Sequence, residues 1–300
     1  MTEPPLDWGA EALRRQLAPL LPGLSVEVVA QIASTNSALL ERARSAADVA
    51  EEGGAARVRR SVESAAFGRR SGDLQPCLLV AEHQIQGRGR QGRSWQSAPA
   101  ASLTFSLALP LAPPDWSGLS LAVGVTLAET LDPHGAHIGV KWPNDLWLVD
   151  ATAPRSRVGR KLGGILIETV AAGAQRLAVI GIGLNVLPLV TTDTSSGFAC
   201  LQELDAGASA PQVLARVARP LVEALQRFEG EGFAAFASRF AARDLLRGHA
   251  VRTSQAGAAE GVAVGVAPSG ALLLRTPHGV VQVSSGEVSV RLDAPGEAPC

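Results

Sequence analysis

The sequence has little lysine, little cysteine and no long apolar run, and each shortage excludes a class of protein. No stretch approaches the roughly 20 consecutive apolar residues that a membrane-spanning helix needs, so we expect no membrane protein. The three cysteines, Cys77, Cys200 and Cys300, are odd in number and far apart, which argues against a disulfide framework and a cysteine metal site. The first residues lack the basic and then apolar order of a signal peptide, which predicts a cytoplasmic location.

Lysine occupies only two of the 27 basic positions, Lys141 and Lys161. A solvated surface charge is served by either basic residue, whereas a compact ammonium on a flexible stem differs chemically from a planar guanidinium. Both lysines are therefore candidates for a specific task, although chance in a sequence of biased composition explains them equally well. A formal net charge of −1 gives no overall attraction to nucleic acid, and we expect no DNA binding.

The length of 300 residues leaves room for one large domain and one small one. Helix-like and strand-like segments alternate up to about residue 246, with a surface insertion at about 46–75. From 247 to 300, short valine-rich runs alternate with glycine-containing turns, which predicts a small all-β domain. The helices are predicted at 8–21, 117–131 and 211–228, and the strands at 24–33, 77–82, 103–109, 138–142, 145–149, 161–170 and 176–185.

The strongest motif is GRGRQGRSW, residues 87–95, directly after a predicted buried strand. Its glycines let the backbone turn tightly and bring N–H groups close to an anion, while its arginines supply bidentate positive charge. The segment therefore suits a phosphate or a carboxylate. An RGG-type nucleic-acid segment and a merely solvated basic turn are the alternatives, and a single copy between two core strands disfavours the first.

Three further motifs follow along the chain. In KWPNDL, residues 141–146, a strand breaks at proline and presents an amide and a carboxylate, which suits Mg²⁺ and a nucleotide or a simple Asx turn. Adjacent glycines in GRKLGGILIE, residues 159–168, indicate a bulge or a ligand lying against the strand. GIGLNV, residues 181–186, lacks the third glycine of a dinucleotide fingerprint, and close backbone packing explains it. The sequence has no Walker loop, zinc spacing or nucleophile elbow.

Taken together and in this order, the four motifs resemble the signature of the biotin protein ligases. The resemblance covers roughly residues 24–292. It implies an α+β fold, with a central mixed sheet flanked by helices as in class II aminoacyl-tRNA synthetases and lipoyl-attaching enzymes. It also implies a small C-terminal SH3-like β-barrel, so that 1–246 forms the catalytic domain and 247–300 the second domain.

The resemblance also implies a function. ATP and biotin would be the substrates, Mg²⁺ the metal, and biotinyl-5′-AMP the intermediate, from which biotin passes to a lysine of a biotin carboxyl carrier protein. Only 33 residues precede Ser34, too few for the winged-helix repressor domain of some relatives, so we expect a monofunctional ligase. A homodimer is a further expectation at the level of the family. The alternatives are a lipoate or octanoate ligase and a regulator that senses biotinyl-AMP.

The resemblance assigns site residues by position. Those for biotin are Ser34, Thr35, Asn36, Gln84, Arg88, Gly89, Arg90, Lys161 and Gly164. Those for the nucleotide are Gly87, Gly92, Arg93, Trp95, Asn144, Asp145 and Asn185. Catalytic charge would come from Lys161, Arg90 and Arg93, and Mg²⁺ would be bound by Asp145. These residue types suit the chemistry, because a carboxylate must approach an α-phosphate that is also negative.

Overall fold

The computed structural model describes residues 6–51, 75–149, 159–172, 175–190, 196–254, 260–284 and 290–292. Most of the insertion predicted at 46–75 lies outside these residues, as does nearly all of the polar stretch at 150–159. The beginning of the predicted insertion, up to Glu51, instead continues a helix. No helix in the described part of the chain is long and apolar enough to cross a membrane.

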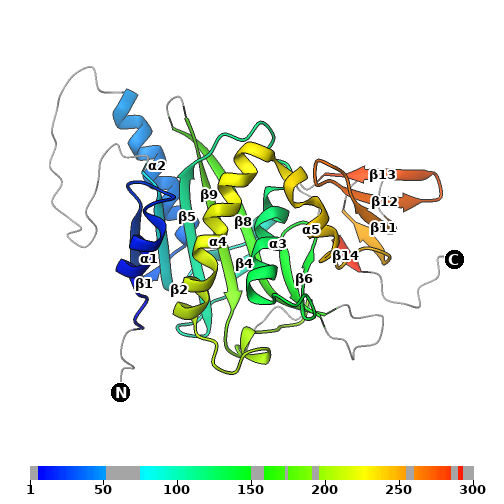
Figure 1. Cartoon of the computed structure of the whole chain (residues 1–300), viewed down its shortest axis with the longest axis horizontal. Helices are drawn as coiled ribbons and strands as arrows, with labels where there is room; N and C mark the ends of the chain where they lie inside the picture. Colours follow the sequence, from blue (N-terminus) through cyan, green and yellow to red (C-terminus); the bar gives the residue numbers. More distant parts are fainter. Residues whose placement is uncertain are drawn as a thin grey trace.

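A seven-stranded mixed sheet forms the centre of the molecule, in the order β1-β2-β5-β9-β8-β7-β6 (Figure 1). Only β1 and β2 are parallel, and every other neighbouring pair is antiparallel. The strands are β1 (Ser25–Ile32), β2 (Cys77–Gln84), β5 (Ser102–Pro110), β6 (Ile138–Lys141), β7 (Asp145–Leu148), β8 (Arg160–Ala172) and β9 (Gln175–Asn185). The predicted central mixed sheet is thereby confirmed, and each strand lies within a few residues of its predicted position.

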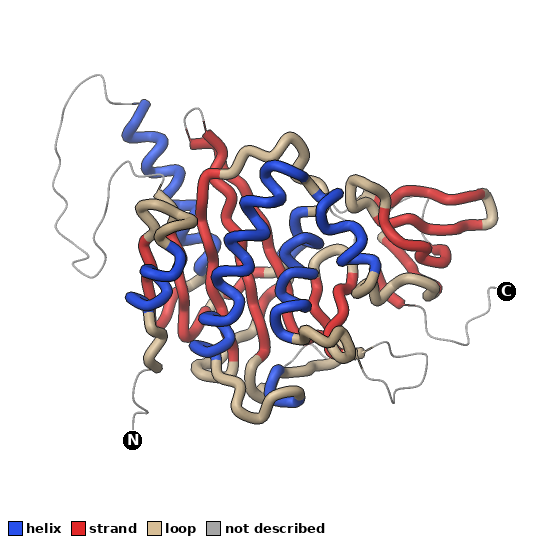
Figure 2. Tube along the Cα trace, viewed as in Figure 1, coloured by secondary structure: helices blue, strands red, loops and turns tan. Residues whose placement is uncertain are grey.

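Helices cover both faces of this sheet (Figure 2). The larger core lies under α1 (Ala10–Leu17), α3 (Leu119–Leu131), α4 (Ala210–Glu231) and α5 (Ala237–Ala241), with two short 3-10 helices, η2 (Leu201–Glu203) and η3 (Phe233–Phe236). A smaller apolar cluster lies on the opposite face under α2 (Thr35–Glu51). Because both faces of the sheet are covered, a strand such as β2 is apolar over its first five residues, Cys77 to Ala81.

Strand β5 is the exception to this apolar pattern. Leu103, Phe105 and Leu107 point into the larger core, and the residues between them therefore point to the face that carries α2. Those residues are Ser102, Thr104 and Ser106, all buried. Buried hydroxyl groups are costly unless they are hydrogen-bonded, so this polar row indicates that the α2 face does more than pack.

The C-terminal segment forms a separate five-stranded antiparallel sheet in the order β13-β12-β11-β10-β14. Its strands are β10 (Ala250–Thr253), β11 (Glu260–Val266), β12 (Leu272–Thr276), β13 (Gly279–Val283) and β14 (Val290–Leu292). The predicted small all-β unit is therefore confirmed. Within the described residues the two end strands, β13 and β14, are not paired, so closure into an SH3-like barrel stays a prediction.

Two consecutive side chains at the end of β6 connect the C-terminal sheet to the central one. The indole Nε1 of Trp142 donates a 3.0 Å hydrogen bond to the carbonyl of Gly270, and Nζ of Lys141 donates a 2.9 Å bond to that of Val290. Trp142 is completely buried.

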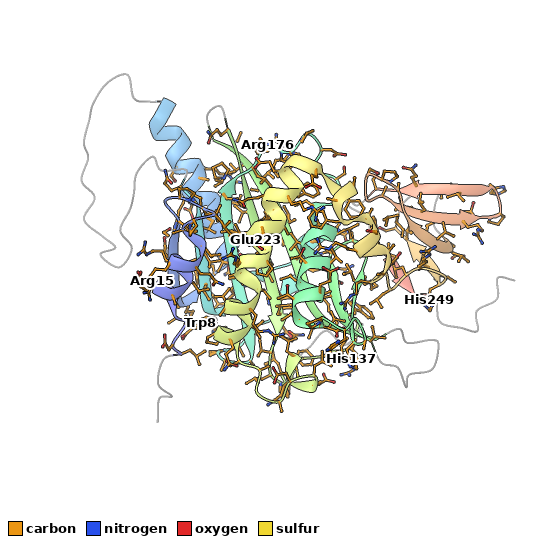
Figure 3. The ribbon with its side chains drawn as sticks, in the orientation of Figure 1. Trp8, Arg15, His137, Arg176, Glu223 and His249 are labelled. Atoms are coloured by element: carbon orange, nitrogen blue, oxygen red, sulfur yellow. The ribbon has the colours of Figure 1, made fainter. Side chains whose placement is uncertain are left out.

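In Figure 3, Arg15 on α1 and Trp8 just before this helix lie at one end of the molecule, and His249 lies at the end that carries the C-terminal sheet.

Candidate active site

A pocket opens on the α2 face of the central sheet and gathers most of the residues that the sequence singles out. The first turn of α2, the segment 87–95, the turn after β6 and strands β8 and β9 line it. The predicted site residues in this lining are Ser34, Thr35, Asn36, Gln84, Arg88, Gly89, Arg90, Arg93, Trp95, Asn144, Asp145, Lys161 and Gly164. Residues that lie far apart in the sequence, at 34–95 and at 144–164, therefore meet in one pocket.

One corner of the pocket is a buried network of hydrogen bonds at the beginning of α2. The backbone N–H of Thr35 donates to Oε1 of Gln84 at 2.7 Å, and the hydroxyls of Thr35 and Ser106 lie 2.6 Å apart. Ser106 in turn donates to Oδ1 of Asn36 at 2.5 Å. Ser34 also accepts a 3.4 Å bond from the N–H of Ser37, as a residue that caps a helix N-terminus does.

The floor of the pocket is formed by glycine backbone. Gly164 on β8 pairs with Gly183 on β9, and Gly181 points to the same face two residues away. A Cβ at Gly183 would overlap the ring of Trp95, and a Cβ at Gly181 would overlap the amide of Asn36. These glycines therefore let two lining side chains lie directly against the sheet.

The arginine-rich segment forms a small hairpin rather than an irregular loop. β3 (Gly87–Arg88) pairs with β4 (Ser94–Trp95), and a short 3-10 turn, η1 (Arg90–Gly92), connects them. Arg88 forms an ion pair with Glu168, with 2.9 Å between Nη2 and Oε1. Burial lowers the pKa of Arg90, and the nearby charge of Asp145 opposes that shift.

Lys161 and Asp145 form an ion pair across the pocket. Their Nζ and Oδ1 atoms are 2.8 Å apart, and the two side chains are 29% and 16% exposed. The ammonium also lies 6.0 Å from the centroid of the Trp95 ring. Asn144 is fixed beside them because its Nδ2 donates to the carbonyl of Ile165 at 2.7 Å. A cation, a carboxylate and an amide are thus held together where β6 ends and where β7 and β8 begin.

Positive charge dominates the lining. Five of its side chains are cationic and Asp145 is the one acidic group among them. The cationic residues are Arg88, Arg90, Arg93, Lys141 and Lys161. Such a concave, positively charged surface concentrates anionic ligands such as phosphates and carboxylates. The described residues hold no cluster of three or more His, Cys, Asp or Glu side chains that could bind a metal by themselves.

Three predicted site residues lie outside this lining. Asn185 donates from Nδ2 to the carbonyls of Lys161 and Ala199, at 3.3 and 3.0 Å, so it supports the backbone of Lys161 from behind. Gly87 is packed against Trp95, where a Cβ would meet the backbone. Gly92 takes a positive φ of 69° in the hairpin turn. All three shape the site, and direct contact with a nucleotide stays a prediction.

The prediction from the sequence did not include several residues that form or support the pocket. Gly181 and Gly183 belong to a motif that we interpreted as close packing, and the structure adds that this packing builds a floor. Val290 reaches the lining from the C-terminal sheet, which no local pattern indicates. Ser106 does not line the pocket but supports its polar corner, and it could have been found because hydroxyl and apolar residues alternate in 102–107.

Comparison with known proteins assigns this site to a family. Residues 69–185 match the biotin/lipoate A/B protein ligase family, and residues 250–291 match the biotin protein ligase C-terminal domain. The first match contains the arginine hairpin and the turn after β6, and the second contains most of the C-terminal sheet. With the relatives described next, these matches show that the chain belongs to the biotin protein ligases of this family.

Relatives match along most of their length. The chain is 34% identical to the bifunctional ligase/repressor BirA of Escherichia coli over 286 residues, covering 92% of this chain and 77% of BirA. It is 32% identical to the biotin–[acetyl-CoA-carboxylase] ligase of Mycobacterium tuberculosis, covering 95% and 96%. The biotin protein ligase of Aquifex aeolicus, solved with biotin and ATP, superposes with a TM-score of 0.66 at 25% identity, covering 89% of this chain and 99% of that one.

Proposed function

We propose that the protein is an ATP-dependent biotin protein ligase. It activates the carboxylate of biotin as biotinyl-5′-AMP, releases pyrophosphate, and transfers biotin to a lysine of a biotin carboxyl carrier protein. One observation carries the proposal: five cationic side chains, a glycine floor and a buried polar corner share one pocket in a chain of this family. A cytoplasmic location is part of this proposal.

The first step requires two negative groups to meet. The carboxylate of biotin must approach the α-phosphate, and preorganised cations offset the repulsion and the charge that develops in the transition state. Arg90, Arg93 and Lys161 are the groups we assign to that task. Their positions in the lining, on the hairpin and on β8, let them contact the two reacting groups from different sides.

We also propose that Mg²⁺ takes part in the reaction and that the protein supplies only one of its ligands. Magnesium in nucleotide sites is commonly bound by one or two carboxylates, the phosphates and water. Asp145 is the acidic group in the lining, and Lys161 already neutralises part of its charge at 2.8 Å. We therefore assign Asp145 as one ligand, with the triphosphate supplying others, and the metal would supply Lewis-acid stabilisation of the phosphates.

Biotin-dependent exchange of labelled pyrophosphate into ATP tests the first step directly. We expect exchange with biotin and none with lipoate or octanoate. A biotin carboxyl carrier domain should then acquire biotin in the presence of ATP and Mg²⁺. Exchange driven by lipoate alone would reassign the substrate, and the absence of any exchange would leave a sensor of biotinyl-AMP as the alternative. A homodimer and a lack of DNA binding remain expectations, which gel filtration and mobility shift would measure.

A further inference from the structure

Glu168 on β8 is not among the residues that line the pocket, yet its carboxylate contacts two residues that are. It forms the ion pair with Arg88 on the hairpin, and it accepts a 3.0 Å hydrogen bond from Nδ2 of Asn36 at the beginning of α2. Its side chain is 24% exposed. One carboxylate therefore connects the arginine hairpin to the buried polar corner.

The same carboxylate and the carbonyl of Leu166, which lies 3.1 Å from Nδ2 of Asn36, together fix the orientation of the Asn36 amide. A carboxylate only accepts, so Asn36 must present its NH₂ group to Glu168 and its oxygen to Ser106. Ser106 gives its single proton to Asn36 and therefore accepts from the hydroxyl of Thr35. The oxygen of Gln84 faces Thr35, whose backbone N–H donates to it at 2.7 Å. Gln84 consequently offers its Nε2 as a donor.

We propose that Glu168 is a positioning residue for biotin. It holds the amide of Asn36 against Ser106 and Thr35 in the polar corner, and it holds Arg88 beside the same corner. The inference rests on the proposed function, because it assigns this corner to the ureido group of biotin. The ureido oxygen is an acceptor, and a donor fixed at Gln84 matches it.

Glu168→Gln tests the inference, because a glutamine of the same size removes the charge that holds Arg88 and weakens the hydrogen bond that holds Asn36. We expect biotin to bind about tenfold more weakly, which corresponds to about 1.4 kcal/mol, in calorimetry without ATP. The KM for MgATP, measured by pyrophosphate exchange at saturating biotin, should stay within about twofold of wild type. A merely structural role would not separate the two substrates.

Glu27→Gln is a closely matched control. Glu27 on β1 forms an ion pair with Arg42 at the same distance of 2.9 Å. The side chains of Arg42 and Glu27 are 41% and 29% exposed, against 46% and 24% for Arg88 and Glu168. Glu27 lies outside the pocket lining, and we expect wild-type affinity for biotin. Ser106→Ala interrupts the same chain of hydrogen bonds without touching Arg88, and it should also weaken biotin binding.

The outcomes separate this inference from the proposed function. If wild type binds biotin and the folded Glu168→Gln protein binds it equally well, the positioning role is wrong while the ligase assignment stands. If Glu168→Gln does not fold, as judged by thermal melting, then wild-type affinity in Ser106→Ala overturns the inference. A wild-type protein that binds no biotin refutes the proposed function and this inference with it.

Discussion

Lys161 illustrates how much a single side chain contributes at this site. Its ammonium pairs with Asp145 at 2.8 Å and lies over the Trp95 ring, and its stem lies against Gly164. A flexible stem with a point charge can follow a carboxylate as it becomes an adenylate, whereas a planar guanidinium needs more width. The contacts on three sides leave little of that width.

We therefore predict that Lys161→Ala lowers the rate of single-turnover adenylation on the order of a hundredfold, or about 2 to 4 kcal/mol. Transfer from preformed biotinyl-AMP should be affected far less, which serves as the internal control. Lys161→Arg should rescue adenylation poorly. An arginine variant that reacts at the wild-type rate would show that any cation suffices there.

Gly183 contributes to the site because it has no side chain, which leaves room for the ring of Trp95. A methyl group there would overlap the Trp95 ring, and forcing extra atoms into a packed site typically costs about 1 to 3 kcal/mol. Gly183→Ala should weaken ligand binding about tenfold or more in calorimetry with biotin and ATP. Gly230→Ala is the control: nothing lies near its Cβ position in α4, so binding should not change. Equal affinities in both variants would mean that Trp95 moves aside freely.

At the scale of elements, the arginine hairpin is short and most of its residues are exposed. Its two strands share only two paired positions, Gly87 with Trp95 and Arg88 with Ser94. Segments with few buried contacts open locally at little cost in free energy, and a ligand that binds the closed form suppresses the opening.

Trypsin should therefore cleave after Arg88, Arg90 and Arg93 in the free protein. Biotin and ATP together, at about ten times their dissociation constants, should slow these cuts roughly tenfold. Cleavage after Arg15 in α1, outside the pocket lining, should keep its rate and so controls for inhibition of the protease. Unchanged cleavage of the hairpin would contradict closure on the ligand.

The elements themselves were largely predictable, because long periodic segments dominate this chain. The helix at 117–131 and the hairpin of 161–170 with 176–185 follow directly from apolar patterns and lie close to α3, β8 and β9. The first residues of the insertion predicted at about 46–75 instead continue α2 to Glu51, because the alanine-rich residues after 45 have a high helix propensity.

The site was predictable only where a motif carries chemistry in its own residues. Arg90 and Lys161 stand out in the sequence by charge and by rarity, and the structure brings both to the pocket. Glu168 and Val290 do not stand out, since their roles depend on which strand or sheet lies next to them. Such contacts between residues distant in sequence are set by topology, which no local pattern reports.

At the scale of the whole molecule, the two sheets share one apolar core. Val251 and Leu274 of the C-terminal sheet belong to the same buried cluster as Val140 and Trp142. We propose that the boundary near 247 separates two folding patterns but not two independent units of stability. Since all five tryptophans precede residue 247, fluorescence reports on the first part and far-UV circular dichroism on both. The two urea transitions should coincide.

Trp142 is the test of that connection. Trp142→Phe removes the N–H that bonds Gly270 and leaves a small void, so the free energy of unfolding should fall by about 2 to 4 kcal/mol. Trp116→Phe, at a partly buried residue outside this junction, should cost less than about 1 kcal/mol. If both variants lose the same stability in urea denaturation, the junction contributes nothing special.

The glycine floor has a consequence for attempts to redesign this enzyme. Selection for new acyl donors usually proceeds by trimming side chains until a bulkier compound is accepted, and at Gly164, Gly181 and Gly183 nothing is left to trim. A side chain at Gly181 or Gly183 would displace Asn36 or Trp95, and one at Gly164 would project toward Asp145 and Lys161. Larger biotin analogues would have to be accommodated at the walls, at Trp95, or by a shift of the hairpin. The backbone of β8 and β9 sets the depth of the pocket at this floor. Point mutations of these three glycines can therefore only reduce the space that is available to a ligand.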